Sequence, residues 1–147
     1  LDENGEAEIT SAPLAAETGK TEWTFTISPL LADRRSPFTF HKTTRRQLYD
    51  RERAAGEGDE VIFLNDRGEI TEGSMTNIFI ELNGLLLTPR VSCGLLAGTF
   101  RQDIVDRGKA QEAALTLEDM AKAERIFLAN SVRGMIPARR IFPANGA

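Results

Sequence analysis

The stretch that decides the fold is Val61-Ile-Phe-Leu-Asn-Asp-Arg-Gly-Glu-Ile-Thr-Glu-Gly-Ser-Met-Thr-Asn-Ile-Phe-Ile-Glu81. Its apolar and β-branched runs predict two strands, Val61–Leu64 and Thr76–Leu82. Turn-forming residues separate the strands, at Asn65–Gly68 and again at Gly73-Ser74. The stretch therefore predicts an interrupted sheet with polar residues at the interruption.

Glu72 lies at this second break, where a carboxylate alone is most simply a solvated turn residue. The order of residues is more specific. Gly68-Glu-Ile-Thr-Glu-Gly-Ser-Met-Thr-Asn-Ile-Phe79, about thirty residues after Lys42, resembles the signature of the class IV aminotransferases, the fold type IV enzymes of pyridoxal phosphate (PLP). The resemblance implies that Glu72 pairs with the pyridine nitrogen of PLP. A carboxylate there favours the charged ring, which makes PLP an electron sink.

Lys42 is the candidate catalytic residue, although a lysine at a helix start is usually just solvated. It follows an aromatic segment, Phe38–Phe40, which we expect to be buried, and it precedes a predicted helix that starts at Thr43 or Thr44 and ends near Ala55. The resemblance implies that Lys42 forms the Schiff base with PLP. A primary amine is required for that bond, and a neutral amine can then act as a general base.

The sequence around the lysine, His41-Lys-Thr-Thr-Arg-Arg46, resembles the aminodeoxychorismate lyase branch of the family, including chains fused behind a para-aminobenzoate synthase component. Branched-chain transaminases tend to carry a tyrosine five residues after the lysine, where this chain has Gln47. The segment from Leu128 to Ala138 also resembles the lyase branch.

A phosphate site is predicted farther along. Asn83-Gly84 predicts a hairpin turn into a strand at Leu85–Thr88, and a helix follows a glycine-rich loop and ends near Gly108. The free amides of a helix start suit a phosphate, although any helix start looks similar. The resemblance implies that Leu96 packs under the cofactor ring and that Thr99 and Phe100 hold the phosphate.

The last predicted elements are a strand at Ala110–Leu115, a capped helix from Thr116 to Ala123, and two final strands, the first at Ile126–Ala129. The resemblance implies that Ser131, in the corner after that strand, also contacts the phosphate. A turn serine bonding its own backbone is the alternative.

Composition bounds the functional class. The chain has 147 residues, 41% of them hydrophobic, and a net charge of −4, which suits a soluble globular domain and argues against nucleic acid as a partner. One cysteine, Cys93, excludes an internal disulfide framework and fits a reducing compartment, so we expect a cytoplasmic protein. No apolar run is long enough for a membrane span, and one His and one Cys do not make a zinc site.

The sequence thus predicts an α+β fold, with a mixed, mostly antiparallel sheet of about eight strands and two or three helices, resembling the large domain of a fold type IV enzyme. We expect residues 1–36 to be the end of a small domain with linker strands, including one near Ala7 and Ile9, and residues 37–147 to be the cofactor-binding domain. The turn signal at Asn4-Gly5 suggests that a preceding strand is missing.

The function implied by the resemblance is a PLP-dependent 4-amino-4-deoxychorismate lyase of folate biosynthesis, which makes 4-aminobenzoate and pyruvate from a small-molecule substrate. The alternatives are a branched-chain or D-amino acid transaminase and a non-catalytic isolated domain. A homodimer without a metal is expected by the same resemblance.

Overall fold

The computed structural model describes residues 4–13 and 20–143. The first three residues, part of the expected linker (14–19) and the last four residues lie outside this description.

These residues build an eight-stranded sheet in the order β3-β2-β1-β8-β7-β4-β5-β6. The strands are β1 (Trp23–Leu31), β2 (Glu60–Leu64), β3 (Ile70–Gly73), β4 (Asn77–Leu82), β5 (Leu85–Pro89), β6 (Gln111–Ala113), β7 (Arg125–Asn130) and β8 (Gly134–Arg140). The pairs β2–β3, β4–β5, β4–β7 and β7–β8 are antiparallel, whereas β1–β2, β1–β8 and β5–β6 are parallel. The predicted mixed, mostly antiparallel sheet is confirmed.

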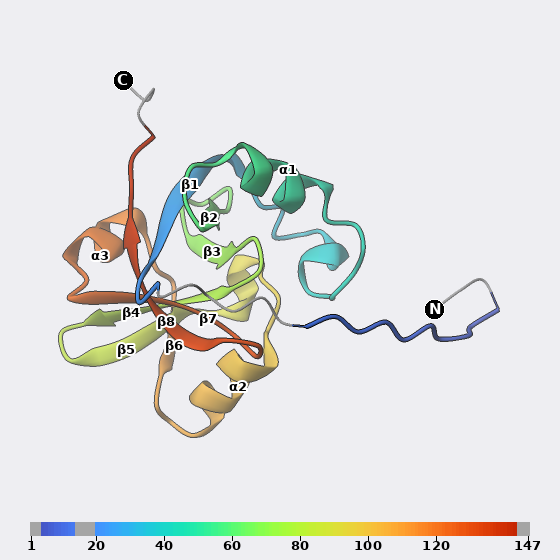
Figure 1. Ribbon diagram of the computed structural model, residues 1–147. Coiled ribbons are helices and arrows are strands. Elements are labelled where there is room, and N and C mark those ends of the chain that lie inside the picture. Colours follow the sequence, from blue (N-terminus) through green and yellow to red (C-terminus); the bar gives the residue numbers. More distant parts are fainter. Residues whose placement is uncertain (1–3, 14–19, 144–147) are drawn as a thin grey trace.

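Three α-helices accompany the sheet in the described part of the chain: α1 (Gln47–Ala55), α2 (Thr99–Asp106) and α3 (Leu117–Lys122). Two short 3₁₀ helices, Pro37–Thr39 and Val91–Cys93, lie in loops. In Figure 1, α1 and α2 lie near opposite ends of the sheet, and α3 lies close to β4 and β5.

Side-chain alternation along β4 divides its residues between two apolar clusters. Ile78 and Ile80 of β4 pack with Met120 of α3 in the largest apolar cluster. Phe79, between them in sequence, points the other way and packs with Phe100 of α2. The sheet is therefore covered on both faces, with α2 on the face opposite α3.

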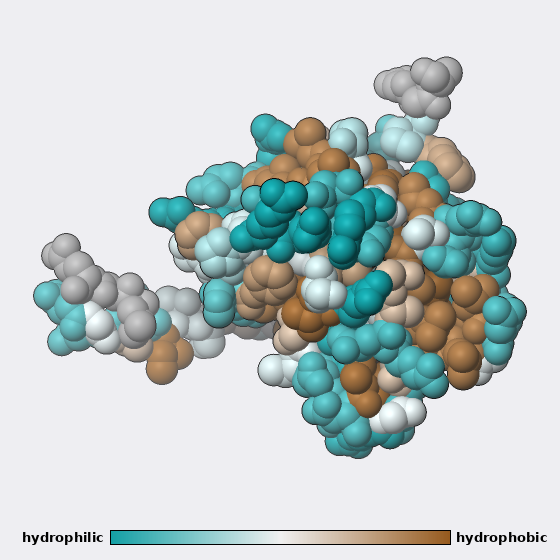
Figure 2. All heavy atoms as spheres, turned by 180° about the vertical axis from the view of Figure 1, so that it is seen from behind, coloured by the Kyte–Doolittle hydropathy of each residue, from teal (hydrophilic) through white to brown (hydrophobic). Residues whose placement is uncertain are grey.

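Seen from behind, hydrophilic residues cover much of the surface, with hydrophobic residues exposed between them (Figure 2). Within the described residues, no helix is both long enough and apolar enough to cross a membrane.

The expected strand near Ala7 and Ile9 is wrong. Residues 6–13 form no strand, the Ile9 side chain is 91% exposed, and the segment stands away from the sheet in Figure 1. Alternation over so few apolar residues does not stabilise a strand that has no partner to pair with. The boundary proposed at residue 36 stays a prediction, although β1, which precedes it, pairs with both β2 and β8.

Two further boundaries differ from expectation. The segment between Val61–Leu64 and Thr76–Leu82 contains an additional strand, β3, which pairs antiparallel with β2. With one large aliphatic residue, Ile70, this strand is too short to produce a period-two signal. Helix α1 begins at Gln47 because the Thr43 hydroxyl accepts from the Arg45 amide in a local turn, at 3.2 Å, instead of capping a helix.

Candidate active site

Glu72 is held from two sides at the end of β3. Its side chain is buried, and the Tyr49 hydroxyl of α1 donates to Oε1 at 3.1 Å. The Leu96 amide donates to Oε2, also at 3.1 Å. The two oxygens thus bind donors from segments that lie on either side of Glu72 in the sequence, which defines the orientation of the carboxyl group.

Burial raises the pKa of Glu72 to about 8, and the neighbouring Glu60 adds to the rise. The Leu96 amide, the Tyr49 hydroxyl and the charge of Arg46 act in the opposite direction. No ion pair to Glu72 is found within residues 4–13 and 20–143. Glu72 is therefore a buried acid without a direct cationic partner in this part of the chain.

The turn between β3 and β4 is anchored by Glu60, a fully buried residue at the start of β2. Its carboxylate accepts from the amides of Ser74 and Met75, at 2.9 and 3.1 Å, and from the Thr76 hydroxyl at 2.9 Å. The Ser74 hydroxyl and the amide of Val61 donate to it as well. This turn directly follows Glu72, so Glu60 fixes the end of the strand that carries it.

Leu96 lies in a loop that is clamped by two asparagines. Asn77, at the start of β4, donates to the Leu96 carbonyl at 2.9 Å, and Asn65 donates to the Cys93 carbonyl at 2.9 Å. The loop also approaches Asn77 so closely that a Cβ at Gly98 would collide with its side-chain oxygen. With the Glu72 contact, these bonds hold the half-buried Leu96 against the sheet.

Thr99 and Ser131 meet at the start of α2. Their hydroxyl oxygens lie 2.6 Å apart, although Thr99 begins the helix and Ser131 follows β7. Phe100 turns its ring into the apolar cluster of Phe79, so only its backbone amide remains for a ligand. Hydroxyl groups and the first amides of a helix are groups of the kind that can bind an anion.

Lys42 is placed differently from the expectation. It lies in an exposed loop between the 3₁₀ helix Pro37–Thr39 and α1, and the preceding Phe38 is also exposed. In the described part of the chain the Lys42 side chain forms no hydrogen bond or ion pair with the other candidate residues. The loop is nevertheless tied to the site, because Arg46 at its end donates to the Ser74 carbonyl.

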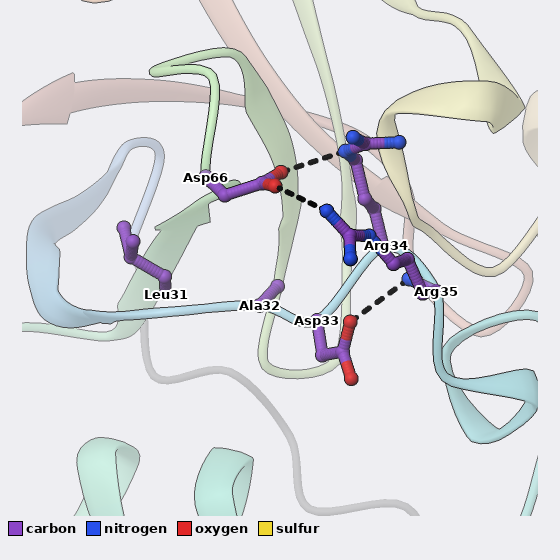
Figure 3. Close-up of a pocket in the computed structure, with 6 residues that line it drawn as sticks. All are labelled: Leu31, Ala32, Asp33, Arg34, Arg35 and Asp66. Carbon is purple, nitrogen blue, oxygen red and sulfur yellow. Dashed lines mark hydrogen bonds and ion pairs between the residues drawn. The ribbon is translucent and has the colours of Figure 1, made fainter.

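A cavity of about 390 Å³ is lined by Asp66 and by residues 31–35, at the end of β1 and in the loop after it (Figure 3). Arg34 and Arg35 from the loop after β1 both point to Asp66 there, at 2.6 and 3.6 Å. None of the predicted site residues lines it. A Cβ at Gly94 would collide with the Arg34 backbone, so the loops at 33–37 and 91–95 pack against each other.

Sequence reasoning missed the polar residues that support the site: Tyr49, Glu60, Asn65 and Asn77. Asn65 was interpreted only as a turn former and Asn77 only as part of a strand. The available signal was a polar residue directly flanking an apolar run, as Glu60 precedes Val61–Leu64. Such a residue is often exposed, so the signal is weak.

The described residues contain no group of three or more His, Cys, Asp or Glu side chains that could hold a metal ion. Cys93 is buried, and burial raises the pKa of its thiol, as is usual for a cysteine that packs as a small apolar residue.

Comparison with known proteins decides the family. The family model described as amino-transferase class IV matches residues 4–141. The chain belongs to the class IV aminotransferase family. The resemblance inferred from the motifs around Lys42 and Glu72 is thereby confirmed at the level of the family.

Solved structures of the family show the same fold. An amino-acid aminotransferase of Mesorhizobium loti, provisionally so named, superposes with a TM-score of 0.79 at 41% identity, covering 88% of this chain and 63% of that one. A 4-amino-4-deoxychorismate lyase of Legionella pneumophila, also provisionally named, gives a TM-score of 0.74 at 26% identity, covering 89% and 53%. The fold is that of the fold type IV enzymes, as predicted.

Curated members of the family are named either as aminotransferases or as aminodeoxychorismate lyases. A protein of Methanocaldococcus jannaschii, provisionally named a branched-chain-amino-acid aminotransferase, is 30% identical over 139 residues, which is 90% of this chain and 48% of that protein. Other relatives are named aminodeoxychorismate lyase. This chain thus spans about half the length of the Methanocaldococcus relative.

Proposed function

We propose that this chain is the cofactor-binding part of a PLP-dependent enzyme of the class IV family. The observation that carries the proposal is Glu72, a buried carboxyl group whose pKa is raised to about 8 and which has two hydrogen-bond donors but, among the described residues, no ion pair. Such a group is stabilised by a cation placed beside it. A protonated pyridine nitrogen is a cation of this kind.

The remaining residues fit the same cofactor. Leu96 is bonded to Glu72 through its amide, so its side chain is positioned to support a ring next to the carboxylate. The hydroxyls of Thr99 and Ser131 and the amide of Phe100 would hold the phosphate at the positive end of the α2 dipole. Bound PLP would supply an electron sink for a developing carbanion.

Lys42 would attach the cofactor through its primary amine and would then move protons as a neutral base. The exposed loop that carries it ends at Arg46, which is fixed on the turn after Glu72. This bond places the end of the Lys42 loop next to Glu72, which supports the assignment.

For the reaction, we propose 4-amino-4-deoxychorismate lyase, which releases 4-aminobenzoate and pyruvate. The support is the resemblance of the segments His41–Arg46 and Leu128–Ala138 to the lyase branch, together with relatives that bear this name. The proposal also includes a small-molecule substrate, a homodimer and a cytoplasmic location.

A class IV transaminase is the second candidate, because the Mesorhizobium and Methanocaldococcus relatives are named as aminotransferases. The two reactions differ in their requirements. A lyase releases pyruvate from aminodeoxychorismate without a keto acid acceptor, whereas a transaminase needs the acceptor and returns its amino acid. An assay with and without acceptor separates them.

The cofactor proposal is tested by covalent mapping. The chain is incubated with PLP, reduced with borohydride and digested, and the pyridoxyl-labelled peptide is identified. We expect the label on Lys42, and we expect Lys42→Arg to abolish it while the matched variant Lys109→Arg keeps it.

Equal labelling of all lysines would contradict a specific site. If only a longer chain, extended at the N-terminus, is labelled on Lys42, the cofactor assignment holds and the present chain lacks part of the pocket. Absence of Lys42 labelling in both chains would overturn the proposal.

A further inference from the structure

Tyr49 contacts the candidate site without belonging to any predicted motif. It is the only tyrosine of the sequence, and its hydroxyl donates to Oε1 of Glu72 at 3.1 Å. Its ring packs on Phe63 of β2 with 4.7 Å between centroids. The guanidinium of Arg46 lies 5.6 Å from the same ring. Packing on two sides therefore fixes the hydroxyl where it meets the carboxylate.

Among the described residues, few charged or polar groups shift the pKa of Glu72. Tyr49 approaches from α1, Arg46 from the residue just before this helix, and Glu60 lies on the neighbouring strand β2. The loop after β5 contributes only the uncharged amide of Leu96. Among these groups, the Tyr49 hydroxyl and the Leu96 amide are the ones that bond the carboxylate directly.

We propose that Tyr49 is a positioning residue for Glu72: its hydroxyl and the Leu96 amide hold one carboxylate oxygen each, which favours the ionised form of Glu72 and keeps the group in one orientation for the cationic ring of the cofactor. The inference rests on the proposed function for the identity of that cation. The contact between Tyr49 and Glu72 is independent of the proposed function.

The physical basis is a donor bound to a buried anion. A hydrogen bond to an ionised group is stronger than a bond between neutral groups, so removal of the donor disfavours the ionised form of Glu72. Each oxygen of an ionised carboxylate has room for a second donor, so the bond from Tyr49 leaves acceptor capacity for a ligand. A residue with a packing role alone would lack this effect on protonation.

The direct test measures the protonation of Glu72 by carbon-13 NMR on the chain labelled at glutamate carboxyl carbons. The signal of Glu72 is identified as the one missing in Glu72→Gln. In Tyr49→Phe, which keeps the ring and loses the hydroxyl, we expect the pKa of Glu72 to rise by about one to two units. The matched variant Leu48→Met, which alters the same helix face without changing a polar group, should leave that pKa unchanged.

A second measurement uses Tyr49 itself and needs no variant of it. Burial and the charge of Glu72 raise the pKa of the phenol. Because the chain has one tyrosine, the ultraviolet absorbance of its phenolate reports this group alone. We expect the titration to move to lower pH in Glu72→Gln, with circular dichroism showing that the fold persists over the range. Identical titrations in both proteins, or an unchanged Glu72 pKa in Tyr49→Phe, would overturn the inference.

Cofactor binding separates this inference from the proposed function. In Tyr49→Phe the affinity for PLP should fall roughly tenfold or more, because the carboxylate that pairs with the ring is less ionised. A raised Glu72 pKa with unchanged PLP affinity would overturn the positioning role. If PLP binds neither protein while the pKa rises, the proposed function fails and the hold of Tyr49 on Glu72 stands.

Discussion

At the scale of the residue, the site depends on one buried acid. A carboxyl group removed from water prefers its neutral form unless a cation or several donors compensate the charge. Glu72 has two donors, from Tyr49 and Leu96, and they offset the burial only in part, because its pKa remains raised to about 8. The cofactor-free chain is therefore most stable with Glu72 protonated.

This imbalance predicts a pH-dependent stability. Glu72 binds its proton more tightly in the folded chain, where its pKa is about 8, than in the unfolded chain, where it has the ordinary value of 4.5. The folded state holds more protons between these two pKa values, so the contribution of Glu72 is full below the lower one and is lost as the pH rises through the upper one. Between pH 5 and pH 8 the loss should be roughly 3 kcal/mol.

Urea denaturation of the wild-type chain and of Glu72→Gln at both pH values measures the effect. The variant keeps a neutral, hydrogen-bonding side chain and should lack this part of the pH dependence. Parallel stability curves for the two proteins would show that Glu72 titrates normally in the folded chain.

At the scale of the element, the β3–β4 turn is the support on which the site depends. Glu60 accepts hydrogen bonds from Ser74, Met75 and Thr76 in a fully buried position, and it forms an ion pair with Arg53 at 3.6 Å. A carboxylate that is satisfied in this way holds together two strands and the turn between β3 and β4. The turn is therefore held by hydrogen bonds within the chain.

We therefore expect Glu60→Gln to destabilise the chain by about 2–3 kcal/mol, since the new amide group places a donor where Met75 or Thr76 already donates. Thermal unfolding checks this value against Glu57→Gln, an exposed glutamate in the loop after α1, which should change stability by less than about 0.5 kcal/mol. Equal effects of the two substitutions would contradict an anchoring role for Glu60.

At the scale of the whole molecule, strands far apart in sequence form the centre of the sheet. β1, near the start, lies between β2 and β8, the last strand. Phe25 of β1 and Ile62 of β2 are fully buried in the same cluster. Residues 6–13, which the alternation also predicted to form a strand, do not join this core.

A matched pair of substitutions tests this division. Ile62→Ala removes methyl groups from the main core and should cost about 2–5 kcal/mol of unfolding free energy. Ile9→Ala, the same change on a side chain that is 91% exposed, should stay within about 0.5 kcal/mol. Chemical denaturation measures both, and a comparable loss in Ile9→Ala would mean that the first segment is packed after all.

The local pattern was sufficient for much of the fold. The hairpin at Asn83-Gly84 forms with positive φ at both residues, and β5 pairs back on β4 as predicted. The capping box of Thr116 and Asp119 begins α3. These elements depend on contacts between residues a few positions apart, which is why the sequence alone was enough to predict them. The order of motifs likewise sufficed for the family.

Tertiary structure alone decided the remainder. The amide of Leu96 and the hydroxyl of Tyr49 reach Glu72 across more than twenty residues on either side, at separations of 24 and 23. Asn77 likewise clamps the Leu96 loop from a different strand. No periodicity encodes such pairs, because their members come from segments that are far apart in the sequence. The sequence by itself therefore determined the family and the candidate residues, whereas their burial and their hydrogen-bond partners, which set the pKa of Glu72, depended on packing between distant segments.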